Sequence, residues 1–77
     1  MSLNLFREIL SRRDPHGYYV IPAEDEAKSL VLMQGVIIVD VGDGILVKTR
    51  SRSQAIKILK MLYKRNLLKL DEIEERI

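Results

Sequence analysis

The sequence contains no cysteine and only one histidine, His16, among its 77 residues. Without cysteine there is no disulfide, no thiolate metal site and no cysteine nucleophile. His16 lies in the turn-forming stretch 14–17, where an exposed turn residue is a simpler interpretation than a general base without an orienting partner. Gly42 and Gly44 match neither of the common phosphate-loop patterns. We therefore expect a protein that is not an enzyme, with no catalytic residue and no cofactor.

A metal site is also not expected. Asp40 and Asp43 flank a glycine-rich turn and are the only acidic pair that suggests a hard cation such as Ca²⁺. Aspartate beside glycine is, however, what a tight hairpin turn itself favours, and two carboxylates are few for a dedicated site. We interpret both residues as turn residues.

Long apolar runs are missing as well. The longest one, residues 30–39, is interrupted by Gln34 and Gly35 and falls short of the roughly 20 apolar residues that a membrane span needs. Charged residues within positions 1–13 break up any signal-peptide pattern. We expect a cytoplasmic protein without a membrane partner, folded as one small α+β domain over residues 1–77. The few amide side chains and the many charges are compatible with a thermophilic source.

Charge is distributed unevenly along the chain, although the net charge is only +2. Residues 14–47 carry a net charge of −5, and residues 70–77 a net charge of −3. Residues 48–69 contain eight basic residues and no acidic one. Because partners respond to local potential rather than to net charge, this acid-free block is the feature most indicative of function.

Apolar periodicity predicts the secondary structure of most of the chain. Apolar residues at helical spacing predict an N-terminal helix over residues 3–12, which the turn at 14–17 ends. Aromatic and β-branched residues predict three strands, at residues 18–21, 36–41 and 45–50. The glycines at 42 and 44 provide the positive φ angles that a tight hairpin between the last two strands needs.

Residues 23–34 allow two interpretations. Pro22 followed by acidic residues 24–26 is typical of a first helical turn, and Gly35 is suited to end such a helix. Alternatively, residues 29–33 begin a long strand that bends at Gly35. We favour the helix.

The last third of the chain predicts two helices. Ser51 and Gln54 have the spacing of a capping box, which predicts a helix up to about residue 65. Asn66 marks a break, and a second short helix follows over the acidic tail. The apolar face of the first helix is predicted to consist of Ala55, Ile56, Leu59, Leu62 and Tyr63. The predicted fold is α+β, a small three-stranded antiparallel sheet with an N-terminal helix, a helix after the first strand and a C-terminal helix pair.

The basic block predicts a nucleic-acid interface. Its strand and helix are expected to present cations to the phosphate backbone, and the serines at 51 and 53 are additional donors. Tyr18 or Tyr19, on a neighbouring strand, is a candidate for stacking on an unpaired base. Exposed lysines also serve helix formation and solubility, which is the competing interpretation. The candidate nucleic-acid-binding residues are Lys48, Arg50, Arg52, Lys57, Lys60 and Lys64.

We therefore predict a non-enzymatic nucleic-acid-binding module without sequence preference, for RNA or DNA. Its helix–three strands–helix order resembles that of double-stranded RNA-binding domains, and residues 50–55 loosely resemble the basic start of their second helix. Ser53 stands where a second basic residue is expected, and Ile56, Ile58 and Leu59 replace an alanine-rich helix. The resemblance is one of topology and assigns no family.

The alternative function is that of a homodimeric structural or protein-interaction module. The middle strand is apolar on both sides, so both faces of the sheet need a cover there. A second copy of the chain is one solution, and a monomer in which residues 23–34 fold over the second face is the other. We expect a homodimer through Val36, Ile37, Ile38 and Val39.

Overall fold

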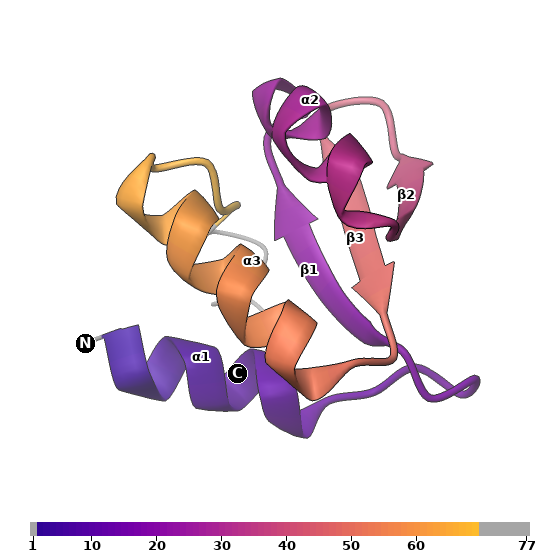
Figure 1. Ribbon diagram of the computed structural model, residues 1–77, viewed down its shortest axis with the longest axis vertical. Helices are drawn as coiled ribbons and strands as arrows, with labels where there is room; N and C mark the ends of the chain where they lie inside the picture. Colours follow the sequence, from indigo (N-terminus) through magenta and orange to yellow (C-terminus); the bar gives the residue numbers. More distant parts are fainter. Residues whose placement is uncertain (1, 70–77) are drawn as a thin grey trace.

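The chain has an α+β fold with a three-stranded antiparallel sheet (Figure 1). The computed structural model describes residues 2–69, with the side chains of residues 6–32 and 34–69. The elements in chain order are α1 (Ser2–Ser11), β1 (Tyr19–Ala23), the 3₁₀ turn η1 (Asp25–Ala27), α2 (Lys28–Val31), the 3₁₀ turn η2 (Leu32–Gln34), β2 (Ile37–Asp40), β3 (Ile45–Thr49) and α3 (Arg52–Lys64). The last predicted helix, over the acidic tail, falls outside the described residues.

The last strand in sequence is the central strand in space. The order in the sheet is β1-β3-β2, and both pairings are antiparallel. Val47 of β3 is opposite Ile21 on one side and Ile38 on the other, so these three side chains share a face. The segment between β1 and β2 crosses from one edge of the sheet to the other. The first two strands are therefore not neighbours.

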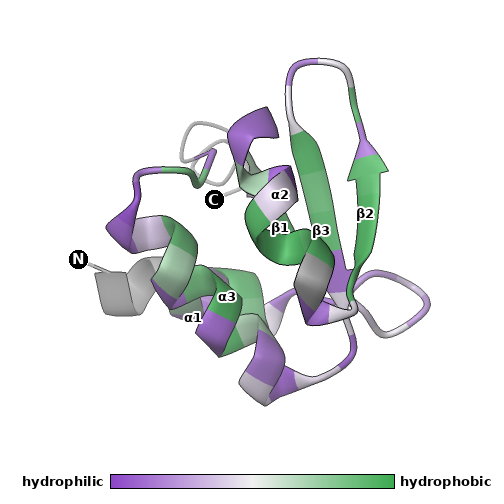
Figure 2. Ribbon diagram, turned by 45° about the horizontal axis from the view of Figure 1, so that its top comes forward, coloured by the Kyte–Doolittle hydropathy of each residue, from purple (hydrophilic) through white to green (hydrophobic). Residues whose placement is uncertain are grey.

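The core lies between one face of the sheet and the helices. Alternate residues of β1 and β3 are buried, and Figure 2 shows most of β3 in green, the colour of apolar residues. Ile9 of α1 and Val31 of α2 complete the core from the N-terminal half of the chain. The largest fully buried side chains are Tyr19, Ile21, Val31, Ile45, Val47, Ile58, Leu59 and Leu62.

The segment that was open to two interpretations is helical. Residues 25–34 form η1, α2 and η2, and Gly35 follows in the left-handed conformation at φ 72°. The strand interpretation is wrong, because this segment makes the crossover between the two sheet edges and packs Ala27 and Val31 into the core.

Strand β1 continues past the proline at which it was predicted to end. Pro22 O accepts a hydrogen bond from Lys69 N at 3.1 Å, on the side of β1 that faces away from β3. The N and O atoms of one strand residue point to the same side, so the absent N–H of Pro22 costs the β1–β3 ladder nothing. The edge position of β1 explains why proline is tolerated.

The start of α3 forms one of the two hydrogen bonds of the predicted capping box. Ser51 Oγ accepts a hydrogen bond from Gln54 N at 3.2 Å, as a helix N-cap does. The Gln54 side chain does not return to the Ser51 amide. It accepts from Thr49 Oγ1 at 2.6 Å and donates to the carbonyl of Gln34. Gln54 thus joins β3, η2 and α3 at one point.

The buried face of α3 is rotated about the helix axis relative to the predicted apolar face. Ala55, Leu59 and Leu62 are buried as predicted, and Ile58 is buried with them. Ile56 is only half-buried, and Tyr63 is 39% exposed. The buried residues recur at intervals of three and four, and Ile56 and Tyr63, which are seven residues apart, lie together at one border of the face. The assignment of these two residues to the core was wrong.

The described residues do not cover strand β2 on both sides. Ile37 is 45% and Val39 is 37% exposed, whereas Ile38 between them faces the helices and is half-buried. Residues 25–34 pack against the core and leave Ile37 and Val39 exposed, so the alternative in which residues 23–34 cover the second face within a monomer is wrong. The homodimer stays a prediction. None of the helices within residues 2–69 has the length and apolar content that crossing a bilayer requires.

Candidate nucleic-acid interface

The junction between β3 and α3 presents two of the predicted arginines. Arg50 and Arg52 flank the N-cap Ser51, and both side chains are exposed. The first turn of α3 contains no acidic residue. Free amides and the positive end of the helix dipole attract an anion there, whereas they disfavour a cation such as Arg52.

Arg13, which the sequence did not single out, lies close to Arg52. Arg13 Nη2 donates a hydrogen bond to Tyr19 Oη at 2.6 Å. This hydrogen bond lowers the pKa of the Tyr19 hydroxyl, burial opposes it, and Arg52 lowers the pKa further. The Tyr19 hydroxyl therefore brings together an arginine from the loop after α1 and one from the start of α3.

Arg50 is held by the other tyrosine. Its guanidinium carbon lies 4.6 Å from the centroid of the Tyr18 ring, a cation–π contact across neighbouring strands. The two predicted stacking residues are thus not equivalent. Tyr19 is fully buried, so its candidacy for base stacking is wrong, and Tyr18 already has Arg50 over its ring.

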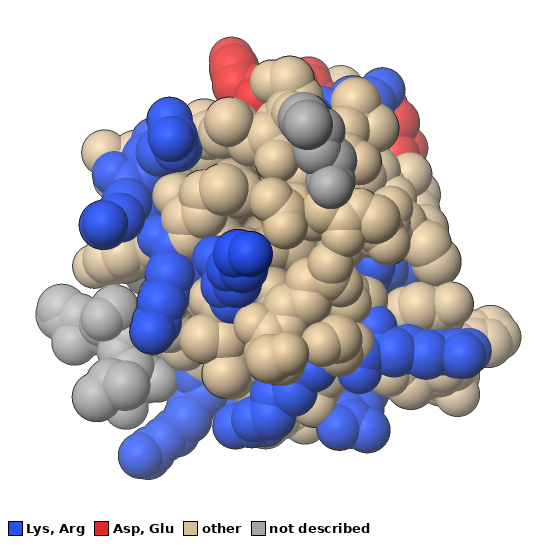
Figure 3. All heavy atoms as spheres, viewed as in Figure 1, with Lys and Arg blue, Asp and Glu red and all other residues tan. Residues whose placement is uncertain are grey.

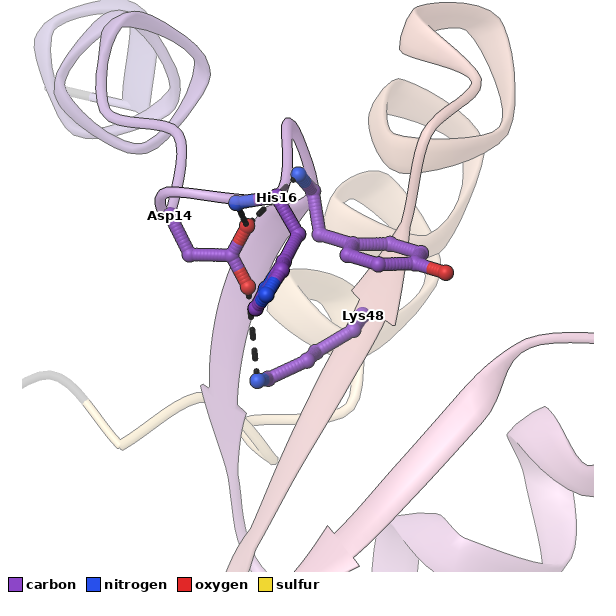
Figure 4. A network of polar contacts seen from close by, with 4 residues as sticks. Asp14, His16 and Lys48 are labelled. Atoms are coloured by element: carbon purple, nitrogen blue, oxygen red, sulfur yellow. Dashed lines mark hydrogen bonds and ion pairs between the residues drawn. The ribbon is translucent and has the colours of Figure 1, made fainter.

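Lys48 has a structural partner. Its Nζ lies 3.4 Å from Oδ2 of Asp14, whose other oxygen accepts the backbone N–H groups of His16 and Tyr18 at 2.9 Å each (Figure 4). The Tyr18 amide lowers the pKa of the Asp14 carboxyl most, burial opposes this, and the His16 amide and Lys48 add to the lowering. Lys48 is therefore less available to a phosphate than the other candidates.

The remaining predicted residues follow the exposed side of α3. Lys57, Lys60 and Lys64 are exposed, and Arg65 at the end of the helix is exposed too. Within residues 2–69 the ion pairs join Arg12 to Glu8, Lys48 to Asp14 and Lys69 to Asp43. We define the basic surface as Arg13, Arg50, Arg52, Lys57, Lys60, Lys64 and Arg65, none of which forms an ion pair with a described residue.

On the face shown in Figure 3, most of the lysine and arginine atoms lie over α1 and α3, and the acidic atoms lie at the opposite end, beyond α2, beside a few basic ones. The acid-free block of the sequence is therefore largely separated in space from the acidic side chains seen on this face.

The acidic residues of the hairpin have local partners. Asp40 Oδ1 accepts from Gly42 N at 2.9 Å, and Asp43 Oδ2 lies 3.8 Å from Lys69 Nζ. In the part of the chain that the structure describes, no three acidic or histidine side chains are grouped so as to hold a metal ion.

Comparison of the chain with models of known protein families, with curated proteins and with solved structures gives no match.

Proposed function

We propose that the chain is a non-enzymatic module that binds nucleic acid through its phosphate backbone. The observation that carries the proposal is the basic surface. Its cations extend along the whole of α3 and the junction before it, and no described residue neutralises them. Phosphate contacts of this kind supply sequence-independent affinity. RNA and DNA both satisfy this chemistry.

The structure refines the set of contact residues. Arg50, Arg52, Lys57, Lys60 and Lys64 are kept, because all five are exposed. Arg13 joins them through its position beside Arg52 at the Tyr19 hydroxyl. Lys48 is a secondary contact, because its ammonium group is paired with Asp14.

Fluorescence anisotropy tests the proposal with labelled single strands, duplex RNA and duplex DNA at about 50 and 200 mM salt. We expect binding that weakens steeply with salt and that falls when Arg50 and Arg52 are both replaced by alanine. Lys28→Ala is the matched control, because Lys28 is an exposed lysine of α2 at the acidic end of the molecule. Absence of binding to all ligands at the lower salt concentration contradicts the proposal.

A second function, that of a homodimeric interaction module, is favoured by β2. This strand lies at the edge of the sheet, its outward side chains Ile37 and Val39 are exposed, and it contains no lysine, arginine or proline. Natural edge strands commonly carry such residues to prevent pairing with another chain. A second copy that pairs along β2 would cover both the free backbone groups and the apolar side chains.

A further inference from the structure

A hollow lies between the C-terminal end of α3 and the helix α1. Of the residues that line it, only Lys60 and Lys64 belong to the contact residues predicted from the sequence. The hollow is wide and open, with a volume of about 540 Å³. Its lining combines aromatic, apolar and basic side chains, namely Phe6, Lys60, Met61, Tyr63, Lys64 and Arg65.

The aromatic part of the hollow contains a partly exposed ring, that of Tyr63. The Phe6 and Tyr63 rings are 5.8 Å apart between centroids and nearly perpendicular, at 87°. In such an edge-to-face pair, Phe6 occupies at most one face of the Tyr63 ring. Tyr63 is 39% exposed, and its hydroxyl has no hydrogen-bond partner among the described residues. A flat, exposed ring is thus held in place by a neighbour that does not cover it fully.

The basic part of the hollow surrounds this ring. Lys60 and Lys64 precede and follow Tyr63 on α3, and Arg65 is the next residue. All three side chains are exposed, and none is ion-paired within residues 2–69. An aromatic face among unneutralised cations matches the chemistry of a nucleotide, which offers a flat base and negatively charged phosphates.

We propose that this hollow binds an unpaired base of a single-stranded nucleic acid. The base stacks on the free face of the Tyr63 ring, and the phosphates on either side of it contact Lys60, Lys64 and Arg65. The inference rests on the proposed function and specifies its ligand, because a base inside a duplex is stacked on its neighbours and does not offer its face. Tyr63 takes the role that the sequence suggested for Tyr18 or Tyr19.

The test compares two substitutions of one residue. Tyr63→Leu keeps an apolar side chain against Phe6 but removes the ring, and Tyr63→Phe keeps the ring but removes the hydroxyl. Anisotropy is measured with a single strand of about 12 nucleotides and with a blunt duplex of the same sequence. We expect Tyr63→Leu to weaken single-strand binding about tenfold, Tyr63→Phe to change it less than about twofold, and neither to alter duplex binding.

The outcomes separate this inference from the proposed function. If the wild type binds both ligands and Tyr63→Leu binds the single strand as tightly as the wild type, the stacking site is refuted and the backbone-binding function stands. Binding of the duplex alone also refutes the site. If the wild type binds neither ligand at low salt, the proposed function itself fails.

A second measurement detects stacking directly by fluorescence. The single strand carries 2-aminopurine, whose fluorescence falls when the base stacks on an aromatic ring. We expect quenching at saturating wild-type protein and the same quenching with Tyr63→Phe. Unchanged fluorescence in a complex that anisotropy shows to be saturated contradicts stacking at Tyr63.

Discussion

Arg13 donates a hydrogen bond from Nη2 to the hydroxyl of Tyr19 at 2.6 Å, and Arg52 also lowers the pKa of this hydroxyl. The Tyr19 ring is fully buried in the core, whereas Arg13 and Arg52 are exposed. The hydroxyl of one core residue therefore connects a cation from the loop after α1 with a cation at the start of α3.

Replacing Tyr19 by phenylalanine removes this connection. The ring keeps its place in the core and its contact with the Arg13 guanidinium, whose carbon lies 4.7 Å from the ring centroid, but Arg13 Nη2 loses its hydrogen-bond acceptor. We expect nucleic-acid affinity to fall about two- to fivefold, because the arginines must then be ordered by the ligand. Tyr18→Phe is the control, since the Tyr18 hydroxyl has no hydrogen bond within the described residues. Equal affinities of the two variants in anisotropy would contradict the role of the Tyr19 hydroxyl.

Arg50 and Lys48 differ in availability, although both lie at the end of the same strand. Arg50→Ala should lower the slope of log affinity against log salt by about 0.9 for duplex DNA, the value for one lost phosphate contact. Lys48→Ala should lower it less, because the lysine already interacts with Asp14 at 3.4 Å. A salt titration of both variants measures this, and a larger effect at Lys48 would reverse the assignment.

The Asp14 carboxylate makes the stability of the fold depend on pH. Its folded-state pKa is below the ordinary value of 3.8, chiefly because it accepts the Tyr18 amide. A depressed pKa contributes stability that is complete above the unfolded value and is lost as the pH falls through the folded value. Asp14→Asn retains an oxygen for both amides but loses the charge. We expect this variant to be less stable than wild type at pH 7 and equally stable below the folded pKa, as measured by urea unfolding.

Gly44 is required for space rather than for its φ angle. The sequence suggested a positive φ at both hairpin glycines, but only Gly42 has one, at 96°. A Cβ on Gly44 would lie 2.7 Å from the backbone oxygen of Ala23, which cannot easily move. We expect Gly44→Ala to lower the free energy of unfolding by about 1–3 kcal/mol, as other overpacked sites do. Urea unfolding measures it, and an unchanged midpoint would show that the hairpin shifts without cost.

The edge strand gives a prediction about assembly. If copies pair along β2, light scattering should show a dimer, and replacing Ile37 and Val39 by lysine should give a monomer with the same circular dichroism spectrum. Charged side chains on an edge strand oppose such pairing. A wild-type protein that stays monomeric as its concentration rises would exclude this interface.

Local patterns were sufficient to predict the type of nearly every described element. Periodicity and turn residues identified α1, the three strands and α3, and Gly35 marked the end of the short helical segment before β2. The boundary of the α3 core face was predicted less well. Ile56 and Ile58 are chemically identical and two positions apart, so only packing against the sheet decides which of them is buried.

The candidate site, like the fold, could be predicted only in part from local sequence patterns. Exposure of the α3 lysines followed from helical spacing alone. The pairing of Lys48 with Asp14 and the approach of Arg13 to Tyr19 depend on the turn after α1 folding back along β1, which no local pattern reveals.

The two edges of the sheet differ in whether a further strand can join them. Along β1, the described chain supplies its own neighbours, since Arg13 pairs beside Tyr19 and Leu68 beside Ala23. In residues 2–69 only the β2 edge has a full strand that is free to pair with another strand. Two copies that meet there use up the attachment point of each, so this kind of growth stops at a closed pair and cannot continue into a fibre.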